Sequence, residues 1–125
     1  MNVRRTAVIF RKRILPWSET FIAFCPYAPR FAYETWILPR AHGAAFARAK
    51  DAEITAFAAM LRQIVSALEQ VQENAPFNYL IESPVVEKAD AATYHWHLEL
   101  IPRLSRGAGL EWGTGLHINP TLPEE

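Results

Sequence analysis

One long stretch with the spacing of an amphipathic helix, beginning at Asp51, limits most strongly what this 125-residue chain can fold into. Apolar residues recur there every three or four positions, which places them on one face of a helix. They are Ile54, Phe57, Ala58, Leu61, Ile64, Val65, Leu68 and Val71. Asp51 suits the N-cap position. Pro76 predicts an end near Glu73 and Asn74, because the residue before a proline avoids helical backbone.

Short apolar runs bounded by prolines surround this helix, and each of them predicts a β-strand. The predicted strands cover residues 20–25, 33–38, 77–82 and about 92–101, with a further strand at 7–10. Strands that precede and follow one long helix favour an α+β fold with an antiparallel sheet. The length suits a single domain of residues 1–125, in which we expect residues 1–19 to be a flanking segment.

The composition argues against several classes of protein. Lys plus Arg and Asp plus Glu number 13 each, so the net charge gives no sign of nucleic-acid binding. No apolar run reaches the ~18 residues of a membrane span, and the N-terminus has no apolar signal-peptide segment. Cys25 is the only cysteine, which excludes an internal disulfide and fits a reduced, cytoplasmic compartment. We expect Cys25 to be a small buried hydrophobic residue rather than a nucleophile.

Residues 94–102, YHWHLELIP, carry the clearest sign of chemistry. Side chains alternate between the faces of a strand, so His95, His97 and Glu99 share one face and apolar residues occupy the other. Ionisable groups on a packed strand are costly unless they have partners. The two imidazoles predict a zinc or iron site with His42 as the natural third ligand. Two alternatives stay open: a nucleophile or phosphate contact, and a purely structural hydrogen-bonded pair.

Several motifs resemble, in the family's order, the C-terminal half of galactose-1-phosphate uridylyltransferases, in the histidine-triad superfamily. They are FIAFCP (21–26), YETWILPRAH (33–42), PFNY (76–79), YHWHLE (94–99) and AGLEWGTG (108–115), followed by Asn119-Pro120 and Pro123-Glu124. The resemblance implies a histidine-triad-like fold. It also implies a nucleotidyltransferase of galactose metabolism that exchanges a uridylyl group between UDP-glucose and galactose 1-phosphate.

The resemblance also assigns roles to individual residues. His42, His95 and His97 resemble ligands of a structural zinc or iron, whose fourth ligand is a glutamate of the family's N-terminal half. Glu111 resembles the acidic residue that contacts the sugar, and Trp112 and Gly113 are weaker substrate-binding candidates.

Some of these roles compete with simpler ones. Glu111 is equally consistent with an exposed turn carboxylate, and Asn78 with either a ribose or phosphate contact or a strand end. Arg40 and Arg103 adjoin prolyl turns, where a phosphate contact and an ordinary solvated arginine are both open.

The nucleophilic histidine of the family lies in a His-Pro-His motif that this chain lacks, so we assign no catalytic residue. The expected ligands are a nucleotide sugar and a sugar phosphate, and the expected partner is an N-terminal catalytic half or a second copy. One alternative is a free-standing histidine-triad-like nucleotide hydrolase or transferase with His97 as the nucleophile. Glu99 opposes it, because it replaces the third histidine of a triad and would repel phosphate. The other alternative is a non-catalytic nucleotide-sugar-binding module.

Overall fold

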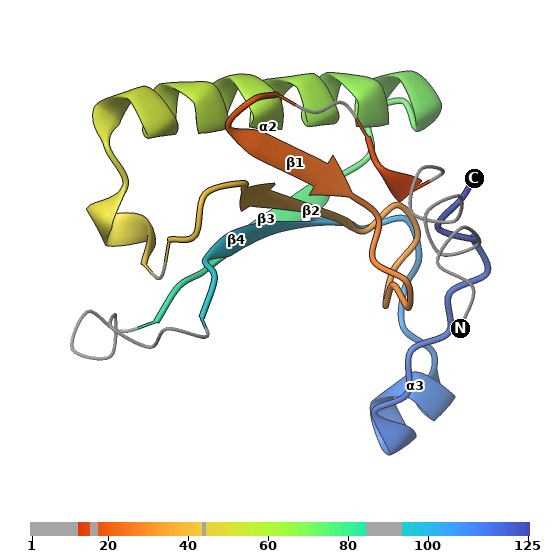
Figure 1. Ribbon diagram of the computed structural model, residues 1–125. Helices are drawn as coiled ribbons and strands as arrows, with labels where there is room; N and C mark the ends of the chain where they lie inside the picture. Colours follow the sequence, from red (N-terminus) through yellow and green to blue (C-terminus); the bar gives the residue numbers. More distant parts are fainter. Residues whose placement is uncertain (1–12, 16–17, 44, 85–93) are drawn as a thin grey trace, which may run out of the picture.

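The computed structural model describes residues 13–15, 18–43, 45–84 and 94–125. Four strands form one antiparallel sheet in the order β1-β2-β4-β3, and one long helix lies along it (Figure 1). The strands are β1 (Phe21–Phe24), β2 (Thr35–Pro39), β3 (Phe77–Glu82) and β4 (His97–Pro102), and the helices are the 3₁₀ turn η1 (Phe46–Arg48), α2 (Asp51–Val71) and α3 (Gly109–Thr114). The predicted α+β class is confirmed. The strand predicted at 7–10 lies outside the described residues.

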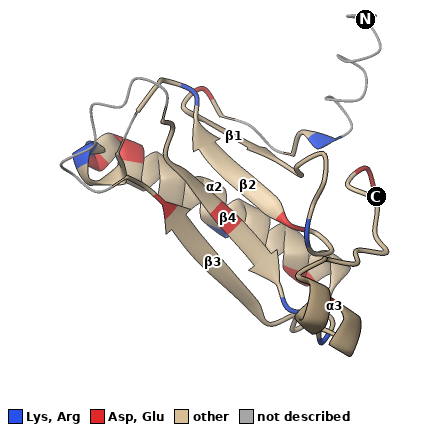
Figure 2. Ribbon diagram, turned by 90° about the horizontal axis from the view of Figure 1, so that it is seen from below, with Lys and Arg blue, Asp and Glu red and all other residues tan. Residues whose placement is uncertain are grey.

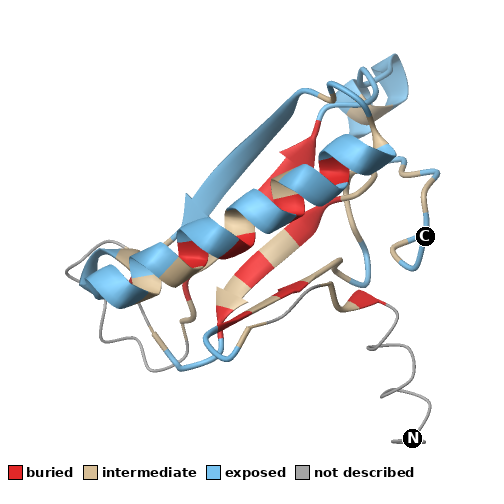
Figure 3. Cartoon of the chain, turned by 90° about the horizontal axis from the view of Figure 1, so that it is seen from above, coloured by how far each residue is buried: buried red, intermediate tan, exposed pale blue. Residues whose placement is uncertain are grey.

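Helix α2 covers one face of the sheet and buries its apolar side there (Figure 3). The core residues that α2 contributes are Phe57, Met60, Ile64 and Leu68, and those from the sheet are Phe21, Ala23, Ile37, Leu98 and Leu100. Ile37 and Leu98 are register partners and are both fully buried. The indole of Trp96, just before β4, packs edge-on against the ring of Phe57 at a centroid distance of 5.3 Å. The apolar faces that the sequence patterns predict for the strands and for the helix therefore pack against each other in a single core.

The ends of α2 differ slightly from the sequence prediction. The N-cap is Lys50 rather than Asp51, and the backbone N–H of Lys50 donates to the carboxylate of Glu53 at 2.8 Å. Asp51 is instead the first helical residue, where its charge still favours the positive end of the helix dipole. The helix ends at Val71, before the predicted position, and Asn74 adopts a left-handed φ of 53° that turns the chain toward β3. Asparagine tolerates this conformation better than most residues.

The face of the sheet opposite α2 is not covered by a long helix; of the described helices only the short α3 lies on that side, at the ends of β3 and β4 (Figure 2). At one end of the strand order, residues 13–15 continue the sheet past β1, because Ile14 bridges to Phe24 and the N–H of Leu15 donates to the carbonyl of Ala23 at 2.9 Å. Part of the predicted flanking segment is thus attached to the sheet. At the other end β3 is an edge strand with all six residues exposed. None of the described helices has the length and apolar character needed to cross a membrane.

Candidate functional site

The start of β4 places the side chains of His97 and Glu99 on the face of the sheet opposite α2. The predicted alternation is confirmed, because Leu98 is buried in the core while His97 and Glu99 point to the other face. The register pairs Glu99 with Trp36 of β2, so the indole of Trp36 lies on the same face. The ring of Trp36 stacks on that of His97, with centroids 4.7 Å apart and an interplanar angle of 21°. His95 precedes the strand.

The three predicted metal ligands do not converge in this structure. The rings of His42 and His95 pack edge-on with centroids 5.5 Å apart, and Nε2 of His95 lies 2.7 Å from the carbonyl oxygen of Pro39. The ring of His97 turns elsewhere, with Nδ1 3.1 Å from the carbonyl of His95 and Nε2 3.4 Å from Glu99 Oε1. A metal bound at either ring nitrogen of His97 would take the place of the oxygen now beside that nitrogen. Because a neutral imidazole carries one N–H, it can donate to only one of these two oxygens. Within the described ranges, no three His, Cys, Asp or Glu side chains form a group that could hold a metal ion as placed.

The face of the sheet that carries His97 also carries a charged network of Arg30, Glu34 and Glu99, which was not predicted from the sequence. Nη2 of Arg30 donates to Glu34 Oε1 at 3.1 Å and to Glu99 Oε2 at 2.5 Å. The side chain of Glu34 is 1% exposed, that of Glu99 11% and that of Arg30 42%. Glu34 also accepts hydrogen bonds from the backbone N–H of Arg30 at 2.6 Å and from Trp36 Nε1 at 3.0 Å. The one sign of this network in the sequence is Glu34, because an acidic residue in an apolar strand requires a partner.

The network sets the charge states of its members. Burial by itself raises the pKa of Glu34, but the hydrogen bonds from Trp36 and Arg30 outweigh it and hold this pKa below its ordinary value. Partial burial lowers the pKa of Arg30, but the bonds to Glu34 and Glu99 raise it overall. Both groups are therefore charged at neutral pH, and the hydrogen bond from Trp36 Nε1 to Glu34 Oε1 fixes the orientation of the indole that stacks on His97.

A cleft of about 450 Å³ at the far end of β4 gathers three of the four predicted substrate-binding residues. Asn78 of β3 and both Glu111 and Trp112 of α3 line it, together with Arg103 and His117. Gly113 is not part of the lining, and a Cβ atom placed on it would meet nothing within 4 Å.

Both carboxylate oxygens of Glu111 accept hydrogen bonds from the backbone of its own segment. Its Oε2 accepts the backbone N–H of Ala108 at 2.9 Å, and its Oε1 accepts that of Ile118 at 3.1 Å. The hydrogen bond from Ala108, and then that from Ile118, lower the pKa of Glu111. The carboxylate thus caps the short helix α3 and closes the loop that follows it.

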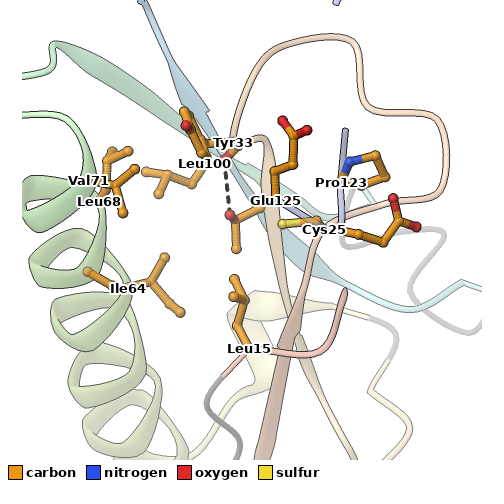
Figure 4. Close-up of a pocket in the computed structure, with 12 residues that line it drawn as sticks. Leu15, Cys25, Tyr33, Ile64, Leu68, Val71, Leu100, Pro123 and Glu125 are labelled. Atoms are coloured by element: carbon orange, nitrogen blue, oxygen red, sulfur yellow. Dashed lines mark hydrogen bonds between the residues drawn. The ribbon is translucent and has the colours of Figure 1, made fainter. Parts of the chain in front are cut away.

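Another cavity, of about 180 Å³, lies between α2, the sheet and the last residues of the chain (Figure 4). Its lining includes the apolar side chains of Leu15, Ile64 and Leu100 and the thiol of Cys25, and none of the predicted site residues. Burial raises the pKa of the Cys25 thiol, which keeps it protonated and a weak nucleophile. The expected weak nucleophile fits this raised pKa, but Cys25 is partly rather than fully buried.

No family model matches this chain, but curated proteins and solved structures do. ADP-glucose phosphorylase of Arabidopsis thaliana is 31% identical over 114 residues, covering 90% of this chain and 32% of the relative. Galactose-1-phosphate uridylyltransferase of Thermotoga maritima is 29% identical over 116 residues, covering 86% of this chain and 36% of the relative. The chain therefore spans about a third of the length of these curated relatives.

Solved structures agree with the sequence comparison. The Arabidopsis thaliana ADP-glucose phosphorylase with bound ADP-glucose superposes on 91% of this chain, and on 38% of its own, with a TM-score of 0.81 and 28% identity. A member of the HIT family of proteins from Bacillus subtilis superposes on 77% of this chain and 70% of its own, with a TM-score of 0.63 and 22% identity. The second likeness concerns the fold alone, and it confirms the predicted histidine-triad-like architecture.

Proposed function

Because this chain is related to the galactose-1-phosphate uridylyltransferase-like nucleotidyltransferases and has their histidine-triad-like fold, we propose that it forms a substrate-binding domain of such an enzyme. The proposed reaction is uridylyl exchange between UDP-glucose and galactose 1-phosphate. The observation that carries the proposal is the cleft that brings Asn78 of β3 together with Glu111 and Trp112 of α3. Since the chain spans about a third of its relatives, turnover would require the remainder of the enzyme. A cytoplasmic location stays part of this proposal.

Titration of the domain with nucleotide sugars tests this function. We expect UDP-glucose to bind, and Trp112→Ala to weaken binding about tenfold, since a ring that stacks on a base contributes ~1–3 kcal/mol. Leu122→Ala, which changes an exposed apolar side chain outside the cleft, is the matched control. Preferential binding of ADP-glucose would identify a phosphorylase like the Arabidopsis thaliana relative. Failure of every nucleotide sugar to bind would refute the proposal.

We also propose that His42, His95 and His97 hold zinc or iron. The support is that the rings of His42 and His95 are already neighbours. To bind the metal through Nε2, His95 would exchange its contact with the carbonyl of Pro39, and His97 its contact with Glu99. Metal analysis of the purified protein and thermal unfolding with and without added Zn²⁺ test this site. We expect bound metal and a higher melting temperature with zinc, both lost in His95→Ala. Absence of metal, with a melting temperature that zinc does not change, would exclude it.

The proposed partner, a second copy or the N-terminal half of the enzyme, would bind along β3. The N–H of Arg103 donates to the carbonyl of Pro76 at 2.7 Å, so the backbone of residue 76 faces β4. Because this direction alternates along an antiparallel strand, the N–H and C=O groups of Phe77, Tyr79 and Ile81 point away from the sheet. Such an edge can pair with a further strand.

Self-pairing of β3 has one register that uses all of these groups. Tyr79 would lie opposite Tyr79 of the second copy, Phe77 opposite Ile81, and Glu82 opposite Pro76, so no like charges would meet. Light scattering over a range of concentrations should show a dimer, which Tyr79→Pro should dissociate because it removes an outward N–H without touching a bond to β4. A monomer at all concentrations would refute self-pairing and favour the N-terminal half as the partner.

A further inference from the structure

The proposed function makes no use of the cavity of about 180 Å³ between α2, the sheet and residues 123–125, because none of the predicted site residues lines it. Helix α2 forms one wall of this cavity, and Cys25, Pro123 and Glu125 lie on the opposite side (Figure 4). Protein interiors are close-packed and rarely leave a void larger than a water molecule beside the core. A hollow of this size is therefore a candidate binding site in its own right.

The lining of this cavity offers little to water. Most of its wall is formed by the apolar side chains of Leu15, Ile64, Leu68, Val71 and Leu100. The hydroxyl of Thr35 is committed, since its Oγ1 donates to the carbonyl of Tyr33 at 3.0 Å. Within the described ranges, no buried side-chain nitrogen or oxygen lacks a hydrogen-bond partner. Water in a cavity needs 2–4 polar partners, whereas an engineered apolar cavity of ~150 Å³ in another protein stays dry and binds benzene. The chemistry of the wall thus favours an apolar occupant.

The walls that face α2 are held in place. Tyr33 adopts a left-handed φ of 59°, which is uncommon for a bulky residue, and the hydrogen bond from Thr35 fixes its carbonyl. On the outer side, Oε1 of Glu124 lies 3.4 Å from Nε of the buried Arg13, which ties residues 123–125 to the segment that continues the sheet past β1. A ligand would therefore enter a largely preformed site and would lose little affinity to ordering the protein.

We propose that this cavity binds a small uncharged aromatic molecule of about the size of toluene, with the sulfur of Cys25 against its ring. The volume of about 180 Å³ suits a single ring, and a thiol sulfur makes favourable contacts with aromatic groups. An anion is disfavoured at the rim, because Glu124 is paired with Arg13 while Glu125 has no ion pair to a described residue. The site shares no predicted substrate-binding residue with the cleft beside α3, so it is independent of the proposed function.

Thermal unfolding of the whole chain with toluene, and with benzoate as an anionic probe of similar size, tests the assignment. Toluene at about ten times its dissociation constant should raise the melting temperature by about 5 °C, and benzoate should leave it unchanged. Alkylation of Cys25 by iodoacetamide in the folded protein locates the bound ligand, because Cys25 is the only cysteine and lines the cavity. The same concentration of toluene should slow this alkylation about tenfold, since only the free protein reacts.

Two variants that fill the cavity complete the test. Ala67→Leu adds bulk from α2, and Cys25→Met adds a flexible thioether from the opposite side, so each should weaken toluene about tenfold or more. Ala59→Leu is the matched control, because it makes the same change at an exposed position of α2 that does not line the cavity. Circular dichroism checks that each variant is folded.

A melting-temperature shift that is lost in both filling variants and kept in Ala59→Leu would support the site. The inference is overturned if toluene neither raises the melting temperature nor slows alkylation, or if benzoate has the same effect as toluene. It is also overturned if toluene binds both filling variants as tightly as it binds Ala59→Leu.

Discussion

Replacing Arg30 with alanine removes the cation shared by two buried carboxylates, and we expect it to destabilise the domain by about 2 kcal/mol. Breaking a fully buried ion pair costs ~3–5 kcal/mol, and an exposed pair contributes ~0–1 kcal/mol. Arg30 lies between these limits, because its side chain is 42% exposed while those of Glu34 and Glu99 are 1% and 11% exposed. Solvent screens the cation, but both carboxylates lose a partner, which places the cost near the middle of the range.

Urea unfolding followed by circular dichroism measures this cost, and its pH dependence tests the mechanism. The folded-state pKa of Glu34 is held below its ordinary value, so Glu34 stabilises the fold above its unfolded pKa, about 4.3. This stabilisation is lost as the pH falls through the lower, folded pKa. The difference between wild type and Arg30→Ala should therefore be large at pH 7 and shrink below about pH 4, as the carboxylate becomes protonated.

Two variants control the Arg30 experiment. Arg62→Ala changes an exposed arginine of α2 and should alter stability by no more than about 0.5 kcal/mol. Arg30→Lys keeps the charge but loses the planar guanidinium with its several donors. The loss in free energy of unfolding should therefore fall between those of the two alanine variants. The reasoning is refuted if Arg30→Ala unfolds at the same urea concentration as Arg62→Ala, or if the cost of Arg30→Ala does not change with pH.

Three further predictions follow from burial and hydrogen bonding. Leu98→Ala should lower the free energy of unfolding by about 2–5 kcal/mol, because this side chain is fully buried, whereas exposed Leu122→Ala should change it by less than about 0.5 kcal/mol in the same urea assay. Cys25 should react slowly with a thiol reagent in the folded protein and at the ordinary rate in urea, since burial raises its pKa; equal rates would contradict this. Glu111→Gln should speed amide hydrogen exchange at Ile118, whose N–H the carboxylate accepts, and an unchanged rate would exclude this closure of the loop.

The fold was largely predictable because its periodicities are explicit in the sequence. The apolar spacing after Asp51 gave the long helix, and the strands before and after it gave the antiparallel sheet. The ends of α2 were less predictable, because they depend on competing local contacts: Glu53 accepts the N–H of Lys50 and shifts the cap by one residue. The helix α3 was not predicted, since its six residues are too few to show a helical period.

The candidate site was only partly predictable, because much of it depends on register. Alternation alone placed His97 and Glu99 on one face. It gave no sign that Arg30, 69 positions before Glu99, reaches across to pair with it. The meeting of Asn78 with α3 likewise depends on how β3 is aligned with β4 and where the chain turns after Pro102. The resemblance to a family identified Glu111 and Trp112, and the prolyl turn singled out Arg103, but only the geometry shows that all three line one cleft.

The position of Arg30 changes the argument about Glu99. From the sequence, a carboxylate in place of a third histidine would repel a phosphate beside His97; in the structure its charge is compensated by Arg30, so repulsion is no longer the main objection to catalysis there. Distance is a stronger objection. His97 begins β4 and Arg103 follows its end, so the strand rise separates them by about 20 Å. A phosphate bound in the cleft beyond the end of β4 would therefore be out of reach of His97, which favours ligand binding rather than nucleophilic attack as the contribution of this domain.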